Sequence, residues 1–127
     1  MTLNDLLLAV ALFQAKHFVA DFLLQPSYVW RNKGTYGHPG GLIHAAVHGI
    51  LSLPALWVLG FGPLLLLAVA AGEAVVHYHV DWGKERLNRS LGLKSDRAAY
   101  WYLFGLDQAM HQFTYVAILG LSVLVLA

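Results

Sequence analysis

Residues 15–25 read AKHFVADFLLQ and carry a lysine, a histidine, an aspartate and a glutamine within a run of apolar side chains. That run and three others approach the length of about 20 residues with which an α-helix crosses a bilayer, and they cover residues 6–24, 42–61, 63–80 and 103–127. We therefore predict an all-α fold, an integral membrane four-helix bundle in a single domain over residues 1–127. The predicted helices span residues 3–25, 42–59, 64–86 and 100–126.

The composition agrees with a membrane protein. Of the 127 residues, 58% are hydrophobic and 12% are charged, whereas a soluble domain carries about 25% charged residues. A soluble four-helix bundle would show a polar stripe along each helix, and the final stretch VAILGLSVLVLA, residues 116–127, has none. The net charge of +1 gives a nucleic-acid partner no electrostatic support. The absence of cysteine excludes disulfides, iron–sulfur clusters and thiolate zinc sites.

The charges of the connecting segments predict the orientation. Four spans place the first and third connections on one side of the membrane, and these connections with their flanks carry Arg31, Lys33, Lys84, Arg86, Arg89, Lys94 and Arg97. The opposite side, formed by both termini and the GFGP turn at residues 60–63, has no lysine or arginine. The positive-inside rule then places both termini outside the cytoplasm. The first residues, MTLNDLLLAVALFQ, lack a basic n-region and a small-residue cleavage site, so we expect them to be retained.

Four pairs of ligand-type residues, each four positions apart, form the main motif. In chain order they are His17 and Asp21, His44 and His48, His77 and Asp81, and Asp107 and His111. Residues four apart lie on one face of a helix, so each predicted helix offers one pair. Because successive helices run in opposite directions, the pairs sort into two layers by depth. The shallower layer contains Asp21, His44, Asp81 and Asp107, and the deeper layer contains His17, His48, His77 and His111, with Glu73 one further turn below His77.

Carboxylates at this depth need a partner. An ionised carboxylate near the membrane centre costs about 2.5–3.5 kcal/mol on insertion scales, and a bound cation removes that cost. Neutral imidazole and carboxylate bind zinc, iron and manganese, and eight such groups suit two divalent metal ions about 3.5–4 Å apart. One such pair alone is more often a structural hydrogen bond. Four pairs at matched depth favour a dinuclear metal site, with a proton or ion pathway as the alternative.

Glu73 and the remaining polar residues have more than one interpretation. Glu73 can be a metal ligand, an acceptor for a histidine N–H, or the partner of Lys16, and if it is not a ligand it is the candidate catalytic proton carrier. His79 is offset by about 200° from His77 around the helix, and His38 lies in a predicted loop, so we place neither in the metal site. Glutamines that flank the pairs are expected to hydrogen-bond to the ligands; they are Gln14, Gln25, Gln108 and Gln112.

Four segments also carry a resemblance to a known family. They read HFVADFLLQ, GGLIHAAVHGIL, HYHVDWGKERL and DQAMHQF, at residues 17–25, 40–51, 77–87 and 107–113. Together they resemble the bacterial membrane proteins grouped as domain of unknown function 3307, over nearly the whole chain. The resemblance implies a multi-pass protein of the bacterial inner (cytoplasmic) membrane but no particular reaction. A looser similarity to membrane-bound metal-dependent hydrolases favours hydrolase chemistry by analogy.

We expect three functions, in decreasing order. The first is a dinuclear metal-dependent hydrolase that acts at the cytoplasmic interface on an amphiphilic, lipid-like ester, amide or phosphoester, with Lys33, Lys84 or Arg86 attracting an anionic head group. The second is a di-iron oxidoreductase acting on lipid or quinone, and the third is a metal or proton transporter. A structural protein with a metal staple is a further alternative. The expected partners are membrane lipid and a small amphiphilic substrate, and the short spans leave surface for a homo-oligomer.

Overall fold

The computed structural model describes residues 2–126, which fold into helices joined by short connections. The elements are α1 (Leu3–Phe18), the π-helical turn η1 (Val19–Leu23), α2 (Ser27–Asn32), α3 (Pro39–Val58), α4 (Pro63–Ser90) and α5 (Ala98–Leu126). Four helices are long and apolar enough to cross a membrane, with α1 and η1 forming one of them. The prediction of an all-α fold with four spans is therefore confirmed, and the described residues contain no strand.

Local sequence explains where the helices begin. Thr2 caps α1 through a capping box, in which the Asp5 N–H donates to the Thr2 hydroxyl and the Asp5 carboxylate accepts from the Thr2 N–H. Pro39 and Pro63 stand at the first positions of α3 and α4, where a missing N–H has no cost. His38, expected in a loop, is the N-cap of α3, and its Nδ1 accepts a hydrogen bond from Gly40 N–H at 3.1 Å.

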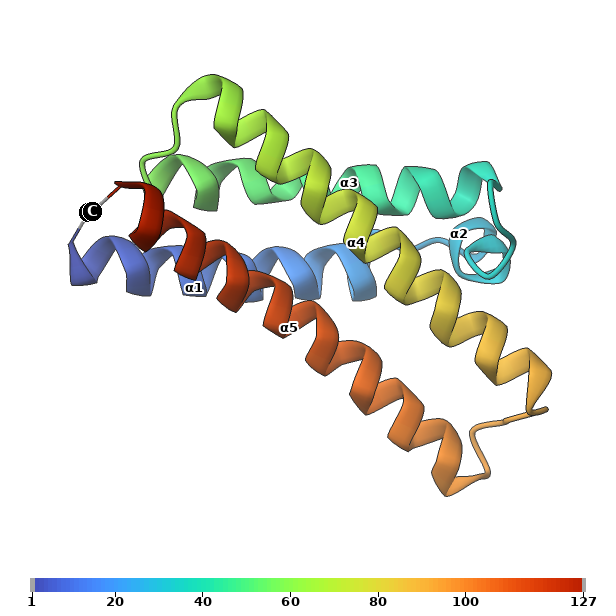
Figure 1. Cartoon of the computed structure of the whole chain (residues 1–127). Coiled ribbons are helices and arrows are strands. Elements are labelled where there is room, and N and C mark those ends of the chain that lie inside the picture. Colours follow the sequence, from blue (N-terminus) through green and yellow to red (C-terminus); the bar gives the residue numbers. More distant parts are fainter. Residues whose placement is uncertain (1, 127) are drawn as a thin grey trace.

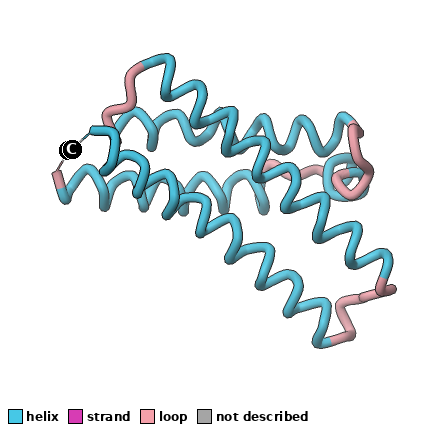
Figure 2. Tube along the Cα trace, viewed as in Figure 1, coloured by secondary structure: helices cyan, strands magenta, loops and turns pink. Residues whose placement is uncertain are grey.

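The helices alternate in direction, as the predicted sorting of the ligand pairs into two layers requires. Figure 1 shows the start of α1, the turn between α3 and α4, and the end of α5 at one end of the molecule. The segment containing α2 and the connection from α4 to α5 lie at the other end (Figure 2). In this view α4 and α5 cross the α1–α3 pair diagonally. The alternation brings the later residue of the pair on α4 to the same depth as the earlier residue of the pair on α5.

Two elements differ from the prediction. The first predicted helix, residues 3–25, is α-helical only as far as Phe18 and continues as η1, with the Leu24 N–H bonded to the Val19 carbonyl five residues earlier. The first connection, predicted as a loop, contains α2, which begins after Pro26. The other three helices extend beyond the predicted boundaries at the ends nearer the basic connections: α3 begins at Pro39, α4 ends at Ser90 and α5 begins at Ala98.

An apolar core fills the end of the bundle at which the chain begins and ends. Its buried side chains come from four helices and the α3–α4 turn, and they are Ala9, Phe13, Ala55, Leu56, Leu59, Phe61, Leu66, Ala70, Tyr115 and Ile118. The rings of Phe13 and Tyr115 stack at 4.8 Å. Gly49 lets α3 approach α4 closely, because a Cβ at this position would lie 3.0 Å from the Ala70 carbonyl oxygen. Small residues at such crossings are typical of membrane helices.

We expect Gly49→Val to destabilise the bundle, because the added side chain would separate α3 from α4. Gly120→Val is the matched control, since a Cβ there meets nothing within 4 Å. Thermal unfolding in detergent should show a lower midpoint for Gly49→Val and a small effect for Gly120→Val. Equal midpoints for the two variants would contradict the close crossing.

Candidate metal centre

The structure brings all eight predicted ligand residues into one cluster between the helices. In the deeper layer the four histidine rings pack together: the ring of His77 stacks on those of His48 and His111 at 3.5 and 4.1 Å. The ring of His17 lies 5.5 Å from that of His48 and 5.3 Å from that of His111. The predicted meeting of the four pairs at one depth is thus observed in the geometry.

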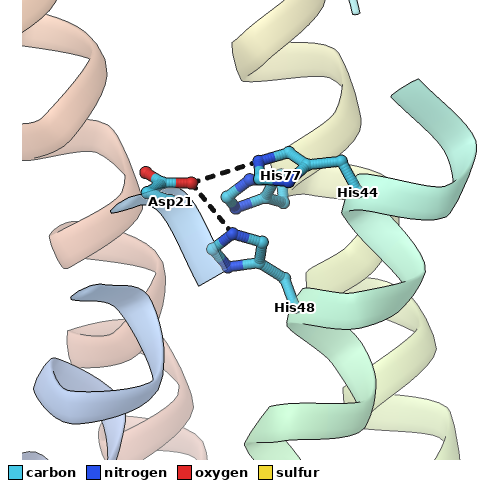
Figure 3. Close-up of side chains that lie close together, drawn as sticks. All are labelled: Asp21, His44, His48 and His77. Carbon is cyan, nitrogen blue, oxygen red and sulfur yellow. Dashed lines mark hydrogen bonds and ion pairs between the residues drawn. The ribbon is translucent and has the colours of Figure 1, made fainter. Parts of the chain in front are cut away.

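Asp21 joins the pairs of the first two spans at one edge of the cluster. Figure 3 shows its carboxylate directed at His44 and His48 on α3, with His77 of α4 beside them. Asp21 Oδ1 lies 3.1 Å from His44 Nε2 and 3.0 Å from His48 Nε2, and Oδ2 lies 3.1 Å from His17 Nε2. Asp21 belongs to η1, and π-helical turns inside α-helices occur frequently at functional sites.

Asp81 occupies the corresponding position between α3, α4 and α5. Its Oδ2 lies 3.2 Å from His44 Nε2 and 3.4 Å from His77 Nε2, and its Oδ1 lies 3.6 Å from His111 Nε2. His44 Nε2 therefore stands between the two carboxylates. The Lys33 ammonium also lies 3.2 Å from Asp81 Oδ2. Lys33 is buried in this contact, so its charge faces the cluster, contrary to the expectation that it attracts a head group.

The two remaining ligand residues extend the cluster. Asp107 Oδ1 lies 3.3 Å from His111 Nε2 on the same helix. His17 Nδ1 lies 2.9 Å from the Tyr115 hydroxyl, and its Nε2 lies 3.0 Å from Gln108 Oε1. With its N–H on Nδ1, His17 can donate to Tyr115 and present Nε2 to a cation, which is the usual arrangement behind a metal-bound imidazole. Gln108 also donates to Asp107 at 3.2 Å, as expected of a flanking glutamine.

Several atoms of the cluster lack the hydrogen bonds that buried polar atoms normally make. These buried atoms are His44 Nε2, His77 Nε2, His111 Nε2 and Asp107 Oδ1, none of which makes a hydrogen bond within residues 2–126. Leaving such an atom unpaired costs about 1–3 kcal/mol. Each lies 3.1–3.6 Å from an opposing nitrogen or oxygen. This is close to the distance of about 3.4 Å expected between two ligand atoms that are each bound at 2.0–2.1 Å to one tetrahedral metal ion.

Two overlapping groups can hold a cation. Asp21, His44, His48 and His77 form one group, and His77, Asp81 and His111 form the other, with ligand atoms in each group within 4.8 Å of one another. His77 belongs to both groups. His17 and Asp107 lie outside them but contact Asp21 and His111, respectively.

A third layer of polar side chains lies beneath the histidines. The Lys16 ammonium forms an ion pair with Glu73, and the Ser52 hydroxyl donates to the same carboxylate. Lys16 Nζ also lies 3.4 Å from His48 Nδ1. Of the three roles considered for Glu73, the observed contacts agree with the role of ion-pair partner to Lys16. Its role as proton carrier stays a prediction.

The lysines change the charge of the centre. With neutral histidines, the four carboxylates of Asp21, Asp81, Asp107 and Glu73 are offset by only two ammonium groups, those of Lys16 and Lys33. The cluster therefore carries two negative charges, rather than the four of its carboxylates alone. It would neutralise one divalent ion, and two such ions would leave two positive charges for further anions.

Sequence reasoning missed some members of the cluster. Lys33 was placed in the first connection as a residue that attracts an anionic head group, and Tyr115 was not considered as a partner of His17. The only available signal was helical spacing, since Tyr115 follows His111 by four positions and therefore lies on the same face. His79 was correctly left out: it is exposed and contacts Tyr36 and the Val75 carbonyl.

A comparison with protein families agrees with the segments that form this centre. A family model described as "Protein of unknown function (DUF3307)" matches residues 7–127, which include every residue of the cluster. The chain belongs to this family. No curated protein and no solved structure matches the chain. Membership of the DUF3307 family agrees with the resemblance seen in the four segments, whereas the similarity to metal-dependent hydrolases finds no support in these comparisons.

The buried pair of Lys16 and Glu73 predicts a coupled effect on stability. Lys16→Met leaves the Glu73 carboxylate without its cation, and loss of one partner of a buried pair costs about 3–5 kcal/mol. The double variant Lys16→Met with Glu73→Gln removes both charges, so we expect its unfolding midpoint in detergent to recover most of the loss. Additive losses in the double variant would show that the two charges do not depend on each other.

The overlapping groups predict that one histidine controls metal binding. Adding zinc, manganese(II) or iron(II) to chelator-treated protein, at about 100 times the dissociation constant, should raise the free energy of unfolding by about 2.7 kcal/mol. His77→Ala should abolish this rise because both groups use its imidazole. His79→Ala, two positions along the same helix, should retain it. A rise that is equal in both variants, or absent with all three metals in the unaltered protein, would contradict the assignment.

Proposed function

We propose that the protein is a membrane-embedded, dinuclear metal-dependent hydrolase that acts on an amphiphilic lipid-like ester, amide or phosphoester. The observation that carries this proposal is the set of buried histidine nitrogens without hydrogen-bond partners, held between carboxylates. Neutral imidazole with carboxylate is the ligand chemistry of zinc, manganese and iron sites in proteins. A neutral, unpaired imidazole beside an acid is the arrangement that a divalent cation stabilises.

Each of the two groups would hold one cation. Asp21, His44 and His48 would bind the first, and Asp81 and His111 would bind the second, with His77 able to serve either. Two adjacent divalent ions lower the pKa of a water bound between them and stabilise the charge that develops on a phosphoryl or carbonyl oxygen. The remaining positive charge of the loaded centre is suited to hydroxide and to an anionic reacting group.

The depth of the centre supports an amphiphilic substrate. The ligand residues lie on the halves of the helices that are nearer the basic connections, while the apolar core closes the other half. By the positive-inside rule these connections face the cytoplasm of a bacterial inner membrane, with both termini outside. A substrate with its polar head at the cytoplasmic interface and its tail in lipid can reach such a site without leaving the membrane.

Two other functions have less support. Di-iron oxidoreductases built on helical bundles use carboxylate-rich Glu-x-x-His motifs, whereas this cluster contains five histidines and three aspartates, with each pair spaced by four. A metal or proton transporter needs a polar path to the far side of the membrane. The apolar core, which includes the buried Phe13, Leu56 and Phe61, fills the half of the bundle through which such a path would have to pass.

The proposal is tested by hydrolysis in lipid–detergent mixed micelles. Metal-loaded protein is incubated with chromogenic acyl ester, acyl amide and alkyl phosphoester lipids, and product release is followed. We expect turnover of at least one class, a loss of at least about 100-fold in His111→Ala, and little change in His38→Asn, which keeps a side-chain acceptor at the N-cap of α3. Metal loss in His111→Ala, together with no activity of the unaltered protein towards any of the three classes, would overturn the proposal.

A further inference from the structure

A groove lies along the lipid-facing side of the seam between α4 and α5. It has a volume of about 530 Å³, within the range of about 300–1,000 Å³ that is typical of small-ligand sites. Most of its walls are aliphatic, from Val76, Val80 and Leu87 on α4 and Leu103, Leu106 and Met110 on α5. A wall of this kind accommodates one linear hydrocarbon chain.

Two charged residues, Lys84 and Asp107, line the groove together with the exposed His79. Lys84 and Asp107 are 9% and 3% exposed. Charged side chains that border lipid are rare and mark sites of function. Asp107 also contacts His111 of the second cation group at 3.3 Å, so the groove adjoins the candidate metal centre.

Lys84 is held in a position where its ammonium can meet an anion. Its Nζ lies 2.7 Å from Glu85 Oε1 and 5.7 Å from the centre of the Phe104 ring. Unlike Lys33, it has no contact with a carboxylate of the centre within 4.0 Å among the described residues. Lys84 lies one turn beyond Asp81 on α4, towards the basic connection, which is the side from which a head group would enter.

The charge of the centre indicates the kind of head group. The cluster carries two negative charges, so two divalent cations would leave two positive charges. A phosphate monoester carries about −1.5 to −2 at neutral pH, which matches this surplus more closely than a neutral ester or amide does. The Lys84 ammonium adds a cation at the end of the groove nearest the centre.

We propose that the α4–α5 groove binds a lipid phosphate monoester, with its alkyl chain along the groove and its phosphate between Lys84 and the second cation position. This inference rests on the proposed function, because it names the substrate class of that same centre. The amphiphile enters sideways from the bilayer, and its phosphate reaches Asp107 and His111 without crossing the apolar core.

A neighbouring cavity, which shares Gly83 and Leu87 with the groove, provides a control. It has a volume of about 670 Å³ and is lined by Arg86, Arg89 and Trp82. Its arginines could attract an anion, but its lining includes no residue of the metal centre. Lys84 lines only the first cavity and Arg86 only the second, so substitutions at these two residues tell the cavities apart.

Glycines on α4 supply a second pair of variants that preserve the fold. Gly83 lines both the groove and the neighbouring cavity, and a Cβ added there meets nothing within 4 Å, so Gly83→Leu would narrow both without a clash, while Lys84 and Arg86 tell the two apart. Gly72 also has open space around it and lies three turns away on nearly the same face of α4, outside the groove. Gly72→Leu is therefore the matched control.

The test measures binding of dodecylphosphonate, a lipid phosphate analogue whose carbon–phosphorus bond is not hydrolysed, to metal-loaded protein in detergent. We expect Lys84→Gln and Gly83→Leu each to weaken binding at least about tenfold, and Arg86→Gln and Gly72→Leu to change it less than about twofold. Dodecanol and inorganic phosphate should bind more weakly than dodecylphosphonate. Absence of binding, equal affinity for inorganic phosphate, or loss of binding in Arg86→Gln alone would overturn the inference.

Hydrolysis assays on the same preparations distinguish this inference from the proposed function. Binding that follows the expected variant pattern without hydrolysis of dodecyl phosphate or other lipids would leave the groove assigned and remove the hydrolase. Hydrolysis of an uncharged ester or amide lipid without dodecylphosphonate binding would retain the hydrolase and remove the groove as its phosphate-lipid site.

Discussion

The structure depends on how carboxylates and imidazoles are accommodated inside a bilayer. Asp21, Asp81 and Asp107 lie in membrane-spanning segments, where water does not compensate an isolated charge. Lys33 compensates part of this charge, and Lys16 compensates Glu73. The imidazole nitrogens that remain without hydrogen bonds show where the protein side chains alone do not complete the network. Divalent cations are the groups that would satisfy both the acids and these nitrogens.

Helical geometry explains why four unrelated segments can build one centre. Each segment contributes two residues one turn apart, and antiparallel neighbours bring those residues to a common depth (Figure 1). Beneath them, the pair of Lys16 and Glu73 and the stacked rings of Phe13 and Tyr115 join the centre to the apolar core. The apolar half of the bundle thus supports the polar half. The absence of a side chain at Gly49 allows α3 and α4 to pack closely against each other.

Much of this arrangement could be predicted from the sequence, because spacing and hydropathy act along single helices. The four spans, the eight ligand positions and the exclusion of His79 all follow from apolar runs and residues four apart. Contacts between distant segments could not be predicted in this way. The sequence placed Lys33 in a connection, and only the path of α2 shows that it reaches Asp81. The π-helical turn that carries Asp21 also has no signal in residue spacing.

Elemental analysis of the protein purified in detergent without added chelator would show directly how many metal ions each chain binds. We predict about two divalent ions per chain, as expected for adjacent cations that share a cluster of carboxylates and imidazoles. Zinc or manganese would agree with hydrolysis, and iron would favour redox chemistry. A ratio near zero, in protein that is folded and was purified from metal-replete cells, would contradict the assignment of this cluster as a metal centre.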